Sequence, residues 1–342
     1  TVETDSFTVK FDESWQIVSL FDKLNNREIV KPGTVANEIR LYADQPDIYD
    51  NWEWQAYSTE KYIALTALES VEEVNDGARH GIKLVRPYKQ SKITQTIWFW
   101  DCFDKIDFET TADWHQHHVM VKAAFPTTIN SDKATYEIQF GTIERPTHFN
   151  TSWDKAKFEV CAQKYADLSD GGFGVSIIND CKYGHDIHNG TITLSLLKCG
   201  TYPNPEADQG EMSFTYSICP HSGRLTDSRT AKYAYYLNYP LTAVKATGET
   251  SELPERWSAV TLSGDHVICE TIKESEDGND TILRLYEYKN QCGRVFVSTD
   301  LKFEKAYLCD LQENELKELE VDAGGDIVLD VTGFEIATIK LK

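Results

Sequence analysis

The side chains best suited to chemistry lie together in residues 145–154, which read RPTHFNTSWD. An indole ring can stack on the C–H face of a sugar, while guanidinium, amide and carboxylate groups pair with its hydroxyls. The segment therefore predicts a carbohydrate contact made by Arg145, His148, Asn150, Trp153 and Asp154. Composition alone favours the alternative, a polar loop whose side chains satisfy buried backbone groups.

Two further segments combine aromatic, amide and acidic side chains. Residues 47–54 read DIYDNWEW, and we expect Trp52 and Trp54 to face one side of a strand beside Asp50. The alternative is an aromatic corner of the core. Residues 203–211 read PNPEADQGE, and their prolines and glycine predict a rigid loop that presents Asp208 and Gln209. An Asx turn that stabilises this loop is the competing interpretation.

No catalytic or metal-binding residue can be assigned from spacing. His115 and His117 would share a face of a strand, as a zinc site could use, but hydrogen-bonded histidines are the favoured interpretation. The sequence contains no GxSxG, P-loop, HExxH or GxGxxG motif. Glycosidase carboxylates come from different strands, so 55 acidic residues offer no pair that spacing could select.

Composition narrows the class of partner. The net charge of −21, from 34 basic and 55 acidic residues, repels phosphate backbones and anionic lipid, so nucleic acid and membrane are not expected. The eight cysteines form no CxxC pair and lie in apolar segments, which predicts reduced thiols packed as small hydrophobes. Without a signal peptide or an apolar run of 18 residues, we predict a cytoplasmic protein.

Period-two alternation of apolar and polar residues dominates the chain and predicts an all-β fold. Strands are expected at residues 106–114, 191–199 and 327–331, with turns at Asn75-Asp76-Gly77 and Asn189-Gly190. Residues 310–320 are the one modest candidate for a helix.

The chain is long enough for two domains, and a stretch rich in proline, glycine and polar residues lies between Tyr239 and Arg256. We therefore predict a large β-sandwich domain at 1–242, a linker at 243–255 and a small C-terminal β-sandwich domain at 256–342.

One long segment resembles a known family. Residues 136–184 read YEIQFGTIERPTHFNTSWDKAKFEVCAQKYADLSDGGFGVSIINDCKYG, and Ala207-Asp208-Gln209-Gly210 is a second match. Both resemble the C-terminal half of the class II α-mannosidases of glycoside hydrolase family 38, in the branch that includes the cytosolic enzymes. The family's Asp-Ala-Trp-Asp pattern becomes Asp50-Asn51-Trp52-Glu53, which puts a role for Glu53 in doubt. The resemblance implies a large antiparallel two-sheet sandwich (a supersandwich, galactose-mutarotase-like) followed by a smaller β-sandwich.

In that family, retaining hydrolysis of α-mannosides uses a nucleophile and zinc held in an upstream α/β barrel, which a helical bundle follows. The resemblance implies that this chain is a fragment without the catalytic barrel, inactive alone and free of zinc ligands. It would support the barrel and lend residues to the rim of the sugar cleft. The expected rim residues are Asp50, Trp52, Arg145, His148, Asn150, Trp153, Asp154, Asp208 and Gln209.

Two other functions remain open at this point. A free-standing carbohydrate-binding module would use Trp52, Trp54 and Trp153 as stacking platforms. A complete sugar-converting enzyme, resembling the aldose epimerases, would need an acid and a base within this chain. If the chain has lost a partner domain, we expect an exposed apolar or aromatic patch, which formation of a homo-oligomer could also cover.

Overall fold

The computed structural model describes residues 1–46, 48–245, 248 and 254–342. These form two compact units, Thr1–Glu137 with Ile143–Leu241, and Ile138–Thr142 with Thr242–Lys342. The predicted linker at 243–255 includes 246–247 and 249–253, which lie outside the described residues. The predicted domain boundaries stay a prediction.

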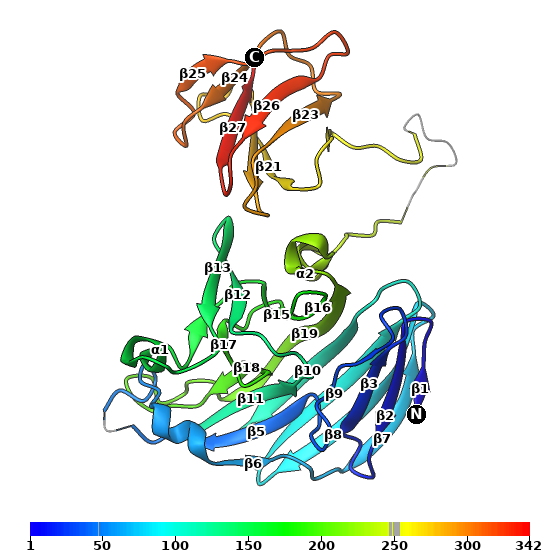
Figure 1. The fold of residues 1–342 in the computed structure, drawn as a ribbon, viewed down its shortest axis with the longest axis vertical. Coiled ribbons are helices and arrows are strands. Elements are labelled where there is room, and N and C mark those ends of the chain that lie inside the picture. Colours follow the sequence, from blue (N-terminus) through cyan, green and yellow to red (C-terminus); the bar gives the residue numbers. More distant parts are fainter. Residues whose placement is uncertain (47, 246–247, 249–253) are drawn as a thin grey trace. The chain divides into compact units, whose positions relative to one another are not determined.

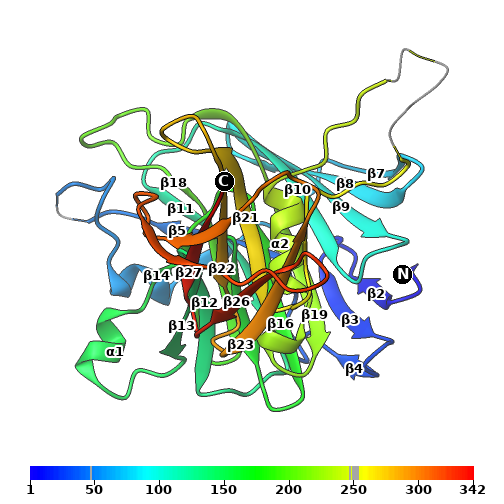
Figure 2. The same ribbon diagram turned by 90° about the horizontal axis from the view of Figure 1, so that it is seen from above.

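The first unit contains three antiparallel sheets (Figures 1 and 2). The largest consists of β7 (Ser70–Asn75), β8 (Arg79–Tyr88), β9 (Ser91–Trp100), β10 (Ile106–Trp114), β12 (Lys133–Ile138), β13 (Gly141–Pro146), β15 (Tyr165–Ser169), β16 (Phe173–Asn179) and β19 (Gly210–Ser222). Its nine strands have the order β13-β12-β15-β16-β19-β10-β9-β8-β7.

A second sheet shares a core with the first. It consists of β5 (Glu38–Ala43), β6 (Tyr62–Ala64), β11 (Val119–Pro126), β14 (Val160–Cys161), β17 (Gly184–His188) and β18 (Thr191–Lys198). Its six strands have the order β14-β17-β18-β11-β5-β6. Four short strands form the third sheet: β1 (Val2–Glu3), β2 (Phe7–Phe11), β3 (Ile17–Asp22) and β4 (Arg27–Glu28).

Side chains from all three sheets meet in one hydrophobic core. Strand β10 matches the predicted strand at 106–114, and its predicted apolar face is fully buried at Ile106, Phe108, Ala112 and Trp114. The Asn189-Gly190 turn joins β17 to β18 with positive φ at both residues, as a two-residue hairpin requires. Alternation and turn chemistry thus predicted these elements correctly.

The second unit is a smaller sandwich with its own core. One sheet contains β20 (Val260–Leu262), β23 (Gly293–Thr299) and β26 (Ile327–Val331). The other contains β21 (Val267–Glu274), β22 (Thr281–Glu287), β24 (Ala306–Cys309), β25 (Glu315–Glu318) and β27 (Ile336–Leu341). The all-β prediction of a large sandwich followed by a smaller one is confirmed.

The helices lie elsewhere than predicted. They are α1 (Ser152–Ala156), α2 (Thr230–Asn238) and the 3₁₀ helices η1 (Ala56–Glu60) and η2 (Leu225–Asp227). The helix expected at 310–320 is wrong, because the Asp310 carboxylate accepts the N–H groups of Gln312 and Asn314 in a turn that leads into β25. Helix α2 was missed because it is short and depends on packing against β16.

The cysteines are only partly as predicted. All eight are free, but Cys102, Cys161, Cys181 and Cys292 are exposed instead of packed as small hydrophobes. Cys199, Cys219 and Cys309 are buried as expected.

Candidate functional site

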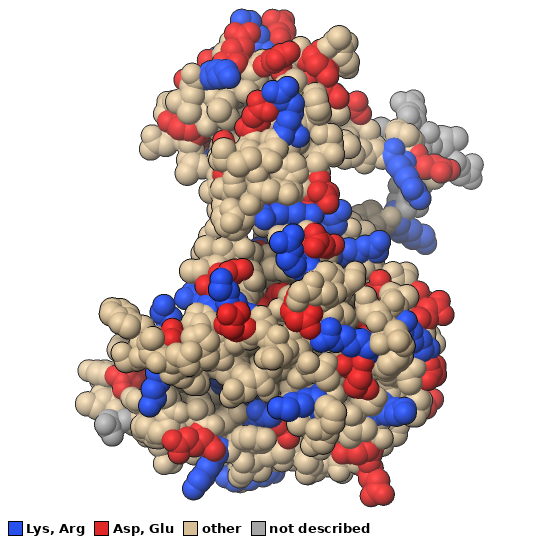
Figure 3. Space-filling model, in the orientation of Figure 1, with Lys and Arg blue, Asp and Glu red and all other residues tan. Residues whose placement is uncertain are grey.

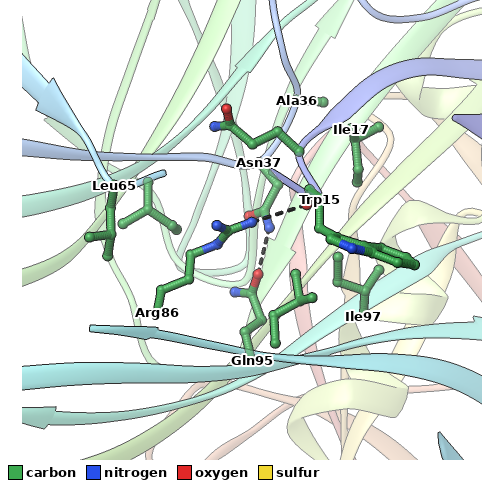
Figure 4. Close-up of a pocket in the computed structure, with 11 residues that line it drawn as sticks. Trp15, Ile17, Ala36, Asn37, Leu65, Arg86, Gln95 and Ile97 are labelled. Carbon is green, nitrogen blue, oxygen red and sulfur yellow. Dashed lines mark hydrogen bonds between the residues drawn. The ribbon is translucent and has the colours of Figure 1, made fainter. Parts of the chain in front are cut away.

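The cavity between the sheets of the large sandwich is too small for an organic ligand. Figure 4 shows that Trp15, Arg86, Asn37 and Gln95 surround it, and its volume of ≈ 10 Å³ has room for about one water molecule. The Arg86 guanidinium donates to four backbone carbonyls, including those of Ser14 and Trp15. This site satisfies polar groups of the core, so a functional site has to be sought on the surface.

Two surface loops are joined by the carboxylate of Asp50. Asp50 is buried and accepts the Thr201 N–H at 2.8 Å, the Thr201 hydroxyl at 3.0 Å and the Tyr202 N–H at 2.7 Å. Burial alone would raise the pKa of Asp50, but the bonds from Tyr202 and Thr201 outweigh it and lower this pKa. Asp50 therefore holds Thr201 and Tyr202 against its own loop, and both of its carboxylate oxygens are engaged in these bonds.

The predicted residues Asp208 and Gln209 lie in the same hydrogen-bonded junction between loops. The Asp208 carboxylate accepts the Lys198 N–H at 2.7 Å, and the Gln209 amide donates to the Gln116 carbonyl at 3.2 Å. The imidazole of His118 approaches Asp50, with 3.1 Å between Nδ1 and Oδ2. The ends of β5, β10 and β18 thus meet through side chains that sequence analysis placed in separate segments.

Three exposed aromatic rings cover this junction. Tyr49 stacks on Trp52 with ring centroids 5.2 Å apart, and Tyr49 lies 5.4 Å from Tyr202. Trp52 is 70% exposed, Tyr202 57% and Tyr49 40%. Tyr49 and Tyr202 line a hollow of ≈ 410 Å³ together with His118 and Ile48. We call Tyr49, Trp52 and Tyr202 the aromatic platform.

The face of the six-stranded sheet that points away from the core carries a buried ion network. On β11, Val121 and Ala123 belong to the core, so Lys122 points to the opposite side, which we call the outer face. Its side chain is only 1% exposed, and its ammonium lies 2.5 Å from a Glu159 carboxylate oxygen and 2.9 Å from one of Asp186. Burial favours the neutral amine, but the two carboxylates outweigh it and raise the pKa of Lys122.

The ion network continues toward the platform. Lys198 pairs with the buried Asp44, whose pKa burial raises. The ring of Trp54 lies between the two lysines, 6.0 Å from Lys122 Nζ and 5.7 Å from Lys198 Nζ. Trp52 and Trp54 are therefore not neighbours on one face of a strand as predicted, because the chain turns at Trp52 and Trp54 packs against the outer face.

The predicted residues of the 147–154 loop lie at the other end of the sheet. Phe149 packs on the His188 ring at a centroid distance of 4.1 Å, and His188 ends β17 opposite Thr191. Lys198 and Thr191 are the two ends of β18, about 23 Å apart for seven residue steps. The nine predicted residues therefore form two groups, one at each end of β18. A single sugar ring cannot contact both groups.

Within this second group, local structure accounts for much of the motif. Thr151 and Asp154 form a capping box for α1, and the bond from Thr151 lowers the pKa of Asp154. His148 Nδ1 lies 3.7 Å from Asp154 and 3.4 Å from the Asn150 N–H. Trp153 is 79% exposed and projects from the helix.

Arg145 lies on β13 with its guanidinium carbon 5.8 Å from the Tyr136 ring centroid, and its Nε is buried without a partner. The 147–154 loop is thus folded as the polar-loop alternative requires, while Trp153 and Arg145 keep groups free for contact.

Within the described part of the chain, four of the twelve buried side-chain polar atoms that lack a hydrogen-bond partner lie on the outer face or in its flanking loops, and the others are spread over both units. The four are Asp44 Oδ1, Asn51 Nδ2, Trp54 Nε1 and His188 Nε2. Such atoms cost free energy unless water, a ligand or another part of the protein satisfies them. The position of these four makes the outer face and its two flanking loops the candidate functional site.

The described residues do not fit a metal ion. No three His, Cys, Asp or Glu side chains among them come together closely enough to hold one. His115 and His117 lie in the loop after β10 instead of on a strand, and the His115 ring contacts Asp113 at 2.7 Å. No zinc chemistry is therefore derived for this chain.

Sequence analysis missed the residues that hold the site together. Lys122, Glu159 and Asp186 come from three separate strands or loops, and Tyr49 and Tyr202 are 153 residues apart in the sequence. One signal was available: Lys122 interrupts the apolar run VMVKAAF, and a charge buried in a strand needs a partner.

Two family descriptions match the chain. Residues 2–206 match the "Glycosyl hydrolases family 38 C-terminal domain" and residues 266–339 match the "Glycosyl hydrolases family 38 C-terminal beta sandwich domain". Together they cover the large sandwich up to the aromatic platform and most of the small one.

Curated relatives and solved structures agree with this assignment. Alpha-mannosidase 2C1 of Homo sapiens is 35% identical over 92% of this chain, and Alpha-mannosidase G of Dictyostelium discoideum is 35% identical over 84%. The chain spans 30% and 27% of these relatives. The crystal structure of an alpha-mannosidase from Enterococcus faecalis covers the whole chain with a TM-score of 0.82 at 17% identity, and the chain covers 42% of it.

The surface offers no extended patch of one charge on the face shown in Figure 3, where acidic and basic side chains are interspersed. Among the described residues, no helix has the length and apolar character needed to cross a bilayer.

Replacing Lys122 should lower the stability of the large sandwich. Lys122→Met leaves Glu159 and Asp186 buried without a cation, so we expect the unfolding free energy of the large sandwich to fall by about 3–5 kcal/mol. Denaturant unfolding measures this loss. The control Lys133→Met removes an exposed pair with Glu144 and should change the free energy by less than about 1 kcal/mol. A small effect of Lys122→Met would contradict the role of the network.

His185 should make stability depend on pH. Burial lowers the pKa of His185 from 6.5 to about 4, so below pH 6.5 the unfolded chain binds a proton that the folded chain does not. Stability should therefore decrease as pH falls from 6.5 to 4, by up to about 3 kcal/mol in total. Denaturant unfolding of His185→Leu across this range should show a flatter profile than that of the original chain, and an unchanged slope would contradict the role of His185.

Proposed function

The chain belongs to glycosyl hydrolase family 38, and we propose that it is the C-terminal, non-catalytic region of a retaining, zinc-dependent α-mannosidase. The observation that carries this proposal is the family match, which extends over both sandwiches. The matched part spans only 30% and 27% of the two curated relatives named α-mannosidases. The nucleophile, the zinc ligands and the remaining active site would then belong to an upstream α/β barrel and helical bundle.

The unsatisfied polar atoms on the outer face support a role beside another domain. Asp44, Asn51, Trp54 and His188 each carry a buried atom that a facing surface or bound water could satisfy. In our proposal the large sandwich supports the barrel, and α-mannoside substrate passes along the edge of this face.

The nine predicted rim residues have different roles in this proposal. Asp50, Asp208 and Asp154 position loops, since their carboxylates accept backbone N–H groups. Gln209, His148 and Asn150 add polar contacts within those loops. Trp52, Arg145 and Trp153 have free ring faces or donors for the sugar, at one end of the sheet or the other.

A cytoplasmic location is also part of the proposal. The exposed thiols of Cys102, Cys161, Cys181 and Cys292 are typical of a compartment that keeps cysteines reduced. Self-association of the chain stays a prediction.

An activity assay tests whether catalysis resides outside this chain. We expect this chain alone to leave an aryl α-mannoside intact, with or without zinc, because its described residues hold no metal site. The full-length protein should hydrolyse the same substrate and lose activity when zinc is chelated. Turnover by the isolated chain that a chelator does not affect would overturn the proposal.

The rim role is tested by Trp153→Ala in the full-length protein. The indole projects into solvent, so its loss should leave the unfolding midpoint unchanged while lowering kcat/KM for a mannoside by about three- to tenfold. The control is Trp257→Ala, an exposed tryptophan of the small sandwich. If both variants keep the original kcat/KM, Trp153 has no contact with substrate.

A further inference from the structure

We propose that the aromatic platform of Tyr49, Trp52 and Tyr202, with the adjoining hollow, binds a neutral hexopyranoside. This rests on the proposed function for the identity of the sugar as a mannoside. It adds Tyr49 and Tyr202 as stacking residues, which sequence analysis did not identify.

The first argument is that the three aromatic side chains are exposed to solvent and yet packed in a defined arrangement. Aromatic rings dominate protein cores, yet here Tyr49 contacts both Trp52 and Tyr202 and all three side chains are 40–70% exposed. The Tyr49 ring is inclined by 24° to that of Trp52 and by 34° to that of Tyr202, so the three rings form one exposed aromatic surface that is not a single plane. A pyranose presents its C–H groups to such a surface while its hydroxyls point sideways.

The second argument is that the platform is held rigidly by its backbone. The Tyr49 carbonyl accepts the N–H groups of Trp52 at 2.8 Å and Glu53 at 3.0 Å. Across the two loops, the Asn51 N–H donates to the Tyr202 carbonyl at 3.1 Å, beside the bonds from Asp50. A ligand therefore meets a preformed surface and loses little free energy in ordering it.

Close packing beneath the platform supports the same conclusion. A Cβ at Gly200 would lie 2.8 Å from the Asp50 carbonyl and from Asn51 Nδ2. The two loops therefore approach too closely for any other residue, which fixes Tyr202 relative to Tyr49.

The third argument is the chemistry of the hollow. Its volume of ≈ 410 Å³ falls within the range of small-molecule sites. The amide of Gln45 and the imidazole of His118 line it, and Asn51 Nδ2 beneath lacks a partner. The Asp50 carboxylate also lines the hollow, but it already accepts the Thr201 N–H, the Thr201 hydroxyl and the Tyr202 N–H. Stacking faces with neutral donors and acceptors fit a sugar.

The test uses this chain labelled with 5-fluorotryptophan and titrated with methyl α-D-mannopyranoside. Fluorine NMR resolves individual tryptophans, and loss of one resonance in Trp52→Ala assigns Trp52. We expect this resonance to shift saturably, with a dissociation constant on the order of 1–10 mM for so small a ligand. The resonance of Trp257, in the small sandwich, should stay unchanged.

Variants then test the platform itself. Tyr202→Ala retains the backbone bonds to Asp50 and Asn51, and should weaken binding by about three- to tenfold through loss of one stacking ring. Tyr236→Ala, which removes an exposed tyrosine of α2, is the matched control and should bind as the original chain does. Unfolding midpoints of both variants verify that the fold persists.

Two results would overturn the inference. One is an unchanged Trp52 resonance at sugar concentrations about ten times the expected dissociation constant. The other is equal binding by the original chain and by Tyr202→Ala. Either could occur while the full-length protein hydrolyses mannosides, in which case the platform is a protein contact and the proposed function stands. If the chain binds the sugar but the full-length protein hydrolyses no mannoside, the platform binds sugar as inferred and the proposed function is wrong.

Discussion

The burial of one lysine ammonium constrains the whole six-stranded sheet. Lys122 cannot remain charged in that position unless carboxylates approach it, and Glu159 and Asp186 do so from the segment after α1 and from β17. Hydroxyls of Ser195 and Thr193 on β18 bond the same carboxylates. The ion network therefore joins β11, β17 and β18 with the segment before β14, and fixes the face on which both candidate loops are built.

The two loops at the ends of that face have different characters. Near Lys198, carboxylates accept backbone N–H groups and fix an exposed aromatic surface in place. Near His188, a capping box and a ring contact stabilise a short helix that projects a tryptophan. The acidic residues predicted at the rim of the sugar cleft thus accept hydrogen bonds from the backbone. The groups left free for a ligand are mostly aromatic or basic.

Local chemistry explains which predictions succeeded. The strand at 106–114 and the Asn189-Gly190 turn depend on alternation and on positive φ, both of which are properties of adjacent residues. The helix expected at 310–320 failed because an Asp310 turn competes with helix formation and Leu311 and Leu316 find no surface to pack against. Helix α2 formed where β16 supplied that surface.

The sequence by itself determined the all-β class, the order of large and small sandwich, and the resemblance to family 38, because strand periodicity and motif order are written along the chain. Only the tertiary structure decided that the nine predicted residues form two groups at opposite ends of β18, and that Asp50 is a clamp instead of a ligand. It also brought Tyr49 to Tyr202 and Lys122 to its two carboxylates. The physical reason is that these distances are set by the pairing of strands and the packing of loops that lie far apart in the sequence, which no local pattern of residues specifies.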